Sequence, residues 1–233
     1  MKKGRNTLII SLVLNVLFIS GGSFVIYKKG GIDFIESQVS AITSTQEYPN
    51  YYLQKKDIFE SLDTTNINKV FIGDSITDHG EFQEYFPNET VLNRGISADN
   101  SKGVLNRIDE VVTREPDEVY IMIGVNDILY DTEKDIFREN INDIVGSFDL
   151  DSTKVAIQSI LPVNNDIYGD AVSNDDVIRF NEILKEVAEQ HNVTYFDIYK
   201  ELVDDNNQLN ERYTLDGIHL TGGGYDKWIE VIK

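Results

Sequence analysis

Four short motifs carry side chains that together could cleave an ester. They are Gly73-Asp74-Ser75-Ile76-Thr77, Asn93-Arg94-Gly95-Ile96-Ser97, Gly124-Val125-Asn126-Asp127 and Asp216-Gly217-Ile218-His219-Leu220. A serine hydroxyl is a weak nucleophile until a neighbouring base takes its proton. Ser75 is the candidate nucleophile and His219 the candidate base. Asp216, three residues before His219, can accept a hydrogen bond from the second ring nitrogen and fix the tautomer.

Attack on an ester also creates an oxyanion, which needs preorganised hydrogen-bond donors. We expect the backbone N–H groups of Ser75 and Gly95 and the side-chain amide of Asn126 to supply them. The residues predicted to contact substrate are Asp74, Ile96, Val163 and Ile218.

Each motif alone is a weak signal, because Gly-x-Asn-Asp is usually a turn and Asp-x-x-His is usually a surface pair. The four occur in order over 144 positions, each after a predicted strand, and that coincidence indicates one site. His79 lies four residues after Ser75. We expect it to face solvent, because the next helical turn points away from the ends of the strands.

The composition excludes several other chemistries. The 233 residues contain no cysteine, which removes disulfides, thiol nucleophiles and zinc sites built on thiolates. Three histidines leave little for an all-histidine metal site, so no metal or other cofactor is predicted. The excess of 40 acidic over 21 basic residues argues against a nucleic-acid partner, whose phosphates need neutralising.

Alternating strands and helices must position these motifs. Apolar runs predict strands at 70–72, 91–93, 119–123, 155–160 and 193–196. The third and fourth are nearly continuous in Val, Ile and Met, which is typical of parallel strands buried on both faces. Helices are predicted to begin at Ser97, Thr132, Ser173 and Thr221. The pattern predicts an open three-layer α/β/α sandwich, in which ligands bind at the carboxyl ends of the strands.

The amino-terminal segment is predicted to be separate from the catalytic domain. Leu8 to Ile26 is an apolar run of 19 residues with basic residues on both sides, long enough to cross a membrane. The extra positive charge before it favours a single-pass helix with the rest of the chain outside. A cleaved signal peptide and a secreted protein are the alternative. The expected organisation is an anchor or signal at 1–29, a stalk ending in a short packed helix at 30–68, and a catalytic domain at 69–233. Five basic and no acidic residues lie in 1–30, so 31–233 carry a formal charge of −24.

The four motifs resemble the conserved blocks of the SGNH (GDSL-type) hydrolases, over about Lys69 to Trp228. The resemblance implies a flavodoxin-like, five-stranded parallel sheet and esterase or lipase activity. It also implies Ser75 as nucleophile, Gly95 and Asn126 as oxyanion donors, and a triad completed by Asp216 and His219. The G-x-S-x-G elbow of the α/β-hydrolases is absent. Two departures from the family pattern are Val125, where threonine is commoner, and Ala98, where glycine is commoner.

The leading hypothesis is therefore a membrane-anchored extracytoplasmic serine esterase that works through an acyl-enzyme. Its expected substrates are short-chain O-acyl esters of glycans, such as acetyl esters, or lysophospholipid-like lipids. The alternative is a non-catalytic surface-binding module that retains the hydrolase fold. A metal- or phosphate-dependent hydrolase using Asp74, Asp127 and Asp216 is disfavoured, because no imidazoles converge with those carboxylates. No oligomeric state is predicted.

Overall fold

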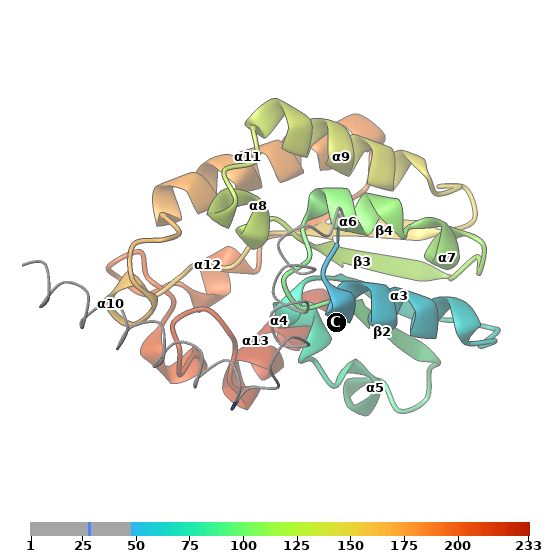
Figure 1. Cartoon of the computed structure of the whole chain (residues 1–233), viewed down its shortest axis with the longest axis horizontal. Helices are drawn as coiled ribbons and strands as arrows, with labels where there is room; N and C mark the ends of the chain where they lie inside the picture. The colour runs from blue at the N-terminus through green and yellow to red at the C-terminus, as the bar shows by residue number, and fades with distance from the viewer. Residues whose placement is uncertain (1–27, 29–47) are drawn as a thin grey trace, which may run out of the picture. The chain divides into compact units, whose positions relative to one another are not determined.

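Five parallel strands form the centre of the structure. The computed structural model describes Lys28 and residues 48–233 (Figure 1). The strands are β1 (Lys69–Gly73), β2 (Val91–Gly95), β3 (Glu118–Met122), β4 (Lys154–Gln158) and β5 (Thr194–Phe196), in the order β2-β1-β3-β4-β5. All four neighbouring pairs are parallel, which confirms the predicted sheet. In this order β1 lies in the interior of the sheet, between β2 and β3, so Ser75 follows a strand that is paired on both sides.

Helices cover both faces of this sheet, and Figure 1 shows the three layers with α9 and α11 on one side and α5 and α13 on the other. The longer helices are α9 (Lys134–Gly146), α11 (Asn174–His191) and α13 (Gly222–Ile232). The shorter ones are α4 (Ser75–Asp78), α5 (Phe82–Tyr85), α6 (Ser101–Asn106), α7 (Asp109–Val112), α8 (Val125–Leu129), α10 (Asn165–Tyr168), α12 (Tyr199–Leu202) and the 3₁₀ turn η1 (Glu211–Tyr213). This is the α/β/α sandwich expected from the sequence.

An aromatic cluster packs between the sheet and α13. The ring of Phe71 on β1 stacks on Phe82 at 3.9 Å and on Tyr120 at 4.9 Å between ring centroids. Trp228 of α13 meets Phe82 edge-to-face at 5.2 Å. Phe71, Phe82 and Trp228 are almost completely buried. Burial of such side chains stabilises the fold by about 1.5–3 kcal/mol each, so α13, and the loop before it, are fixed firmly to the sheet.

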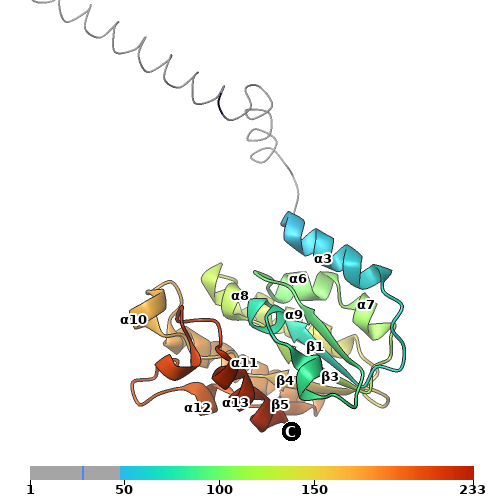
Figure 2. The same ribbon diagram turned by 90° about the horizontal axis from the view of Figure 1, so that it is seen from below.

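One further helix, α3 (Asn50–Ser61), precedes the first strand and packs on the α/β layers (Figure 2). It buries Tyr52 and Phe59 against Ile96, which follows β2. Lys55, in the middle of the helix, forms an ion pair with Asp78 at the end of α4. The helix therefore contacts the loops after β1 and β2 directly.

The predicted helix starts differ in accuracy. Ser173 caps α11 by accepting a hydrogen bond from the Asp175 N–H at 3.2 Å, as expected. The start expected at Ser97 is wrong, because α6 begins at Ser101 with Asn100 as its cap. Residue 98 has a left-handed φ of 64°, which no helix can contain, and this displaces the helix start by one turn.

The predicted membrane helix over residues 8–26 lies outside the described residues, as does the proposed boundary at residue 29. Within the part of the chain that the structure describes, no helix combines the length and the apolar character that a membrane crossing requires.

Candidate active site

Ser75 lies at the sharp turn between β1 and α4. The Asp74 side chain caps the helix by accepting the Ile76 N–H at 3.0 Å. A side chain at Gly73 would place its Cβ 2.1 Å from Thr77 Oγ1 and 2.3 Å from the Met122 carbonyl oxygen. Only glycine fits there, so the chain turns tightly and presents Ser75 as the first residue of the helix.

His219 joins Ser75 to Asp216. The distance from His219 Nε2 to Ser75 Oγ is 2.8 Å, and that from His219 Nδ1 to Asp216 Oδ2 is 2.7 Å. The side chains of His219 and Asp216 are 31% and 54% exposed. This hydrogen-bonded relay of Ser75, His219 and Asp216 is therefore open to solvent. With Nδ1 bonded to a carboxylate, Nε2 is left to accept the serine proton.

The loop before α13 holds Asp216 in place. Its Oδ1 accepts the N–H groups of Ile218 at 3.1 Å and His219 at 2.8 Å, while Oδ2 accepts the ring. Gly217 has a φ of 89°, and a Cβ there would lie 2.7 Å from the Tyr168 N. Burial favours a higher pKa for Asp216, but the His219 ring and the two backbone N–H groups outweigh it and lower the pKa to about 2. Asp216 is therefore ionised at every pH at which the protein is expected to work.

The structure does not place Gly95 as an oxyanion donor. Gly95 is buried, and its N–H already donates to Asn93 Oδ1 at 2.8 Å. Ala98, three residues later, is exposed, and its N–H donates no hydrogen bond within the described residues. Asn126 donates one amide hydrogen to the Asp99 carbonyl oxygen at 2.8 Å, which ties it to the loop that holds Ala98. Within the described residues, Ala98 is therefore the residue between 96 and 100 whose backbone N–H remains unused.

The four side chains expected to contact substrate are instead buried. Asp74, Ile96, Val163 and Ile218 are at most 8% exposed. Asp74 caps α4, Ile96 packs under α3, and Ile218 lies below the histidine loop. Their side chains are therefore packed inside the protein, and a direct contact with substrate stays a prediction.

His79 is exposed, as expected, but it does not point away from the site. Its ring lies 5.0 Å from that of His219 between centroids, at an angle of 44°. The C-terminal end of α4 therefore turns back toward the triad.

Two residues near the site make contacts that were not predicted from the sequence. Arg107 is 4% exposed, pairs with Asp99 at 2.9 Å and donates to the Gly73 carbonyl oxygen at 3.2 Å. Asp127 accepts the N–H and hydroxyl of Ser101 at 2.9 and 2.6 Å. No local pattern identifies the contact of Arg107 with Gly73 or that of Asp127 with Ser101, because the two partners lie at or after the ends of different strands.

Burial changes the acidity of the aspartates in this layer. It raises the pKa of Asp74 to about 7 and that of Asp127 to about 6. In the part of the chain that is described, no three His, Asp or Glu side chains form a group that could hold a metal ion.

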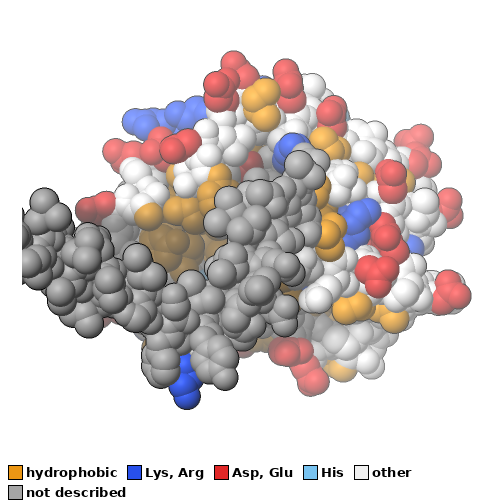
Figure 3. Space-filling view, viewed as in Figure 1, with side chains coloured by type: hydrophobic (Ala, Val, Ile, Leu, Met, Phe, Trp, Pro, Cys, Tyr) orange, Lys and Arg blue, Asp and Glu red, His pale blue; other side chains and the backbone are white. Residues whose placement is uncertain are grey.

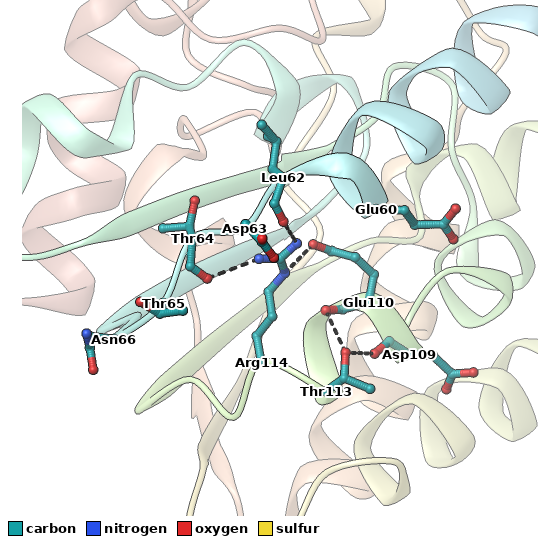
Figure 4. Close-up of a pocket in the computed structure, with 10 residues that line it drawn as sticks. All are labelled: Glu60, Leu62, Asp63, Thr64, Thr65, Asn66, Asp109, Glu110, Thr113 and Arg114. Carbon is teal, nitrogen blue, oxygen red and sulfur yellow. Dashed lines mark hydrogen bonds and ion pairs between the residues drawn. The ribbon is translucent and has the colours of Figure 1, made fainter.

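A separate pocket of about 540 Å³ lies near the C-terminal end of α3 (Figure 4). Arg114 projects into it and donates to the carbonyl oxygens of Leu62 and Thr64, at 2.5 and 3.1 Å. Residues 62–66 lead into the beginning of β1, and Arg114 precedes β3. The pocket is thus at the amino ends of the strands, whereas Ser75 follows a carboxyl end.

Comparisons with known proteins agree with this architecture. The model of the GDSL-like lipase/acylhydrolase family matches residues 71–227. A multidomain esterase of Ruminococcus flavefaciens is 28% identical over 219 residues, which cover 81% of this chain but only 26% of that protein. The chain thus spans about a quarter of the length of that relative.

Solved structures show the same likeness. A protein of Streptococcus pneumoniae superposes with a TM-score of 0.72 at 27% identity, covering 85% of this chain and 96% of the other. A GDSL-like lipase of Bacteroides thetaiotaomicron gives a TM-score of 0.65 at 27% identity, covering 78% and 94%. The chain belongs to the GDSL-like lipase/acylhydrolase family of ester-hydrolysing serine enzymes.

Proposed function

We propose that this protein is an extracytoplasmic serine esterase that removes short-chain acyl groups, such as acetyl, from O-acylated glycans. The observation that supports hydrolysis best is the unbroken relay from Ser75 Oγ through His219 to Asp216, at 2.8 and 2.7 Å. A binding module with the same fold has no use for a base beside a serine. The intact relay therefore favours the enzyme over a non-catalytic module.

The reaction proceeds in two halves. Ser75 Oγ attacks the ester carbonyl carbon while His219 Nε2 takes the hydroxyl proton, and the carbonyl oxygen becomes an oxyanion. The C–O bond to the alcohol then breaks, and His219 returns the proton to the leaving oxygen. A water molecule, deprotonated by the same Nε2, attacks the acyl-Ser75, and release of the acid restores the serine.

Three donors are proposed for the oxyanion. They are the backbone N–H groups of Ser75 and Ala98 and the second amide hydrogen of Asn126, the first being used on the Asp99 carbonyl. Loss of one such donor typically lowers kcat by about 10²–10³-fold. The N-terminus of α4 adds little, because a helix of four residues has a small dipole.

The preference for short acyl groups is supported by the openness of the relay, in which His219 is 31% and Asp216 54% exposed. An open site gives a long acyl chain little surface on which to bind. The apolar side chains of Tyr130 and Leu215 are 56% and 87% exposed. Such residues would favour the alternative substrates, lysophospholipid-like esters. Activity measured against esters from acetyl to palmitoyl separates these two substrate classes.

The test of the esterase itself uses a fluorophosphonate probe, which reacts with activated serines. We expect wild type to be labelled and Ser75→Ala to be unlabelled while keeping its circular dichroism spectrum. Ser147→Ala, at the half-buried C-cap of α9, is the matched control and should label like wild type. Folded wild type that resists the probe, or equal labelling of Ser75→Ala, would contradict the proposal.

We further propose that residues 8–26 tether the catalytic domain to the outer face of the cell membrane. The proposal is supported by the 19-residue apolar run and its basic flanks. Secretion after cleavage of this segment is the alternative.

A further inference from the structure

Asp78 is the last residue of the helix that begins with the nucleophile, and four donors surround its carboxylate. Its Oδ1 accepts Lys55 Nζ at 2.8 Å. Its Oδ2 accepts the Tyr51 hydroxyl at 2.7 Å, and the N–H and hydroxyl of Ser97 at 3.2 and 2.7 Å. Tyr51 and Lys55 lie on α3, whereas Ser97 lies in the loop after β2. One carboxylate therefore joins three elements.

The pair of Asp78 with Lys55 is shielded from water. The side chain of Asp78 is 7% exposed and that of Lys55 is 24% exposed. Burial favours a higher pKa for Asp78, but the hydrogen bonds from Lys55, Tyr51 and Ser97 outweigh it and hold the pKa below its usual value. A charged carboxylate with several donors is a stronger clamp than an exposed surface pair, whose contribution is about 0–1 kcal/mol.

Ser97 is adjacent to the residue with the free backbone N–H. Ala98 follows it with a φ of 64°. The carbonyl oxygen of Asp99, one residue further along, accepts the Asn126 amide at 2.8 Å. The proposed donor Ala98 is thus one residue from Ser97, and the Asp99 carbonyl that holds the Asn126 amide is two residues from it. A shift of Ser97 moves both of them.

The rest of α3 is fixed independently of this clamp. The Tyr52 hydroxyl donates to the Gly103 carbonyl at 2.7 Å and accepts Asn106 Nδ2 at 3.0 Å. Arg114 donates to the Phe59 carbonyl at 2.9 Å. Because these contacts remain when Tyr51 and Lys55 are changed, the clamp can be removed without losing the helix.

We propose that Tyr51 and Lys55 of α3, acting through Asp78, are positioning residues that hold the 96–100 loop in the geometry needed to stabilise the oxyanion. The inference rests on the proposed esterase function. It extends the site beyond residues 71–227, the part that matches the family, to a helix that precedes it. A positioning role predicts an effect on the transition state and little effect on substrate binding.

The experiment compares the double variant Tyr51→Phe/Lys55→Met with wild type in the full chain. Both substitutions keep the apolar bulk of the side chain, and methionine can still cover the Phe59 ring, over which Lys55 Nζ lies at 5.0 Å. With p-nitrophenyl acetate we expect kcat to fall about 10-fold, less than for a lost oxyanion donor. KM should stay within about 2-fold of wild type, because the variant does not change the contacts that hold substrate and transition state equally well. Fluorophosphonate labelling should slow in parallel with kcat.

The matched control is Lys56→Met, which removes a lysine and its ion pair with Glu60 from the same helix without touching Asp78. It should leave kcat unchanged. Asp78→Asn, which keeps an acceptor for Ser97, should retain more activity than Asp78→Ala, and thermal melting identifies any variant that fails to fold.

The outcomes separate this inference from the proposed function. Wild-type kcat in a folded Tyr51→Phe/Lys55→Met variant, with Ser75→Ala inactive, overturns the positioning role and leaves the esterase intact. A rise in KM with kcat unchanged also overturns it. If wild type itself is neither active nor labelled, the esterase proposal is the one that fails.

Discussion

Buried aspartates surround the nucleophile turn. Asp74 is 1% exposed and Asp127 is completely buried, and each accepts hydrogen bonds from backbone N–H groups at the start of a helix. Burial raises the pKa of Asp74 to about 7, with the negative charges of Asp99 and Asp127 adding to the effect. The acid next to Ser75 therefore takes up a proton within the physiological range.

This titration predicts how stability depends on pH. An acid whose pKa is higher in the folded than in the unfolded state binds its proton more tightly when folded, so its contribution to stability is full below about pH 4. The contribution is lost as the pH rises from about 4 to 7, the interval between the unfolded and folded pKa values of Asp74. In Asp74→Asn this titration is absent and the cap acceptor is kept.

We therefore expect Asp74→Asn to gain stability relative to wild type between pH 4 and pH 8, by on the order of 4 kcal/mol. Urea unfolding at a series of pH values measures this difference. Asp151→Asn, at an exposed position, is the control and should show no such trend. Parallel stability curves for wild type and Asp74→Asn would show that the acid does not titrate in this interval.

At the scale of elements, β2 and α4 approach each other through a glycine. A Cβ on Gly95 would lie 2.1 Å from the Asp78 N and 2.6 Å from its Cα. The strand that carries the 96–100 loop thus contacts the backbone of the nucleophile helix. Beyond the strand, Ala98 takes a left-handed φ that favours glycine.

Gly95→Ala and Ala98→Gly are expected to change the free energy of unfolding in opposite directions. Gly95→Ala must push β2 away from α4, which should lower the free energy of unfolding by about 1–3 kcal/mol and reduce kcat. Ala98→Gly keeps the backbone N–H and relieves a left-handed conformation, so it should raise the free energy of unfolding by up to about 1 kcal/mol with activity retained. Urea unfolding and ester turnover test both; a Gly95→Ala variant as stable as wild type would contradict the close packing.

The same two residues show how far the sequence could predict the site. Ser75, His219 and Asp216 were identifiable as candidates from their chemical types and their places after strands, and the structure brings them within hydrogen-bond distance. The choice between Gly95 and Ala98 as donor was not, because it depends on whether Asn93 Oδ1 already accepts the N–H. Burial of Ile96 likewise depends on α3, which packs on it from a distant part of the chain.

The fold could be predicted from the sequence better than the conformations of the loops could. Continuous apolar runs such as 119–123 are sufficient to predict buried parallel strands. The contacts of α3 were not predictable, because Tyr51 meets Asp78 across 27 positions and Tyr52 meets Gly103 across 51. Hydrogen bonds between such distant positions leave no local pattern.

At the scale of the whole molecule, charge is divided unevenly along the chain. Residues 1–30 carry five basic side chains, and residues 31–233 carry a formal charge of −24. Figure 3 shows acidic side chains scattered over the visible face of the domain, with fewer basic ones between them. An anionic domain is repelled by anionic lipid surfaces, so any stable attachment to a membrane should come from the apolar run.

We expect the full chain to sediment with membranes, to resist extraction by carbonate, and to be digested by protease added outside intact cells. Leu14→Arg, in the middle of the apolar run, should weaken this attachment. Lys56→Met, in α3, is the control and should not. A full-length chain in the soluble fraction would contradict the tether, and a secreted chain that lacks residues 1–30 would establish the signal-peptide alternative.

The distance between Ser75 and His219 along the chain also sets when activity can begin. The two lie 144 positions apart, and the loop that holds His219 leads into α13, which packs on the sheet. A ribosome that releases Ser75 must add those residues, at roughly 5–20 per second, before the base exists. At that rate the nascent chain lacks its proposed base for about 7–30 s, so the proposed esterase activity is expected only after His219 has been added and α13 has packed.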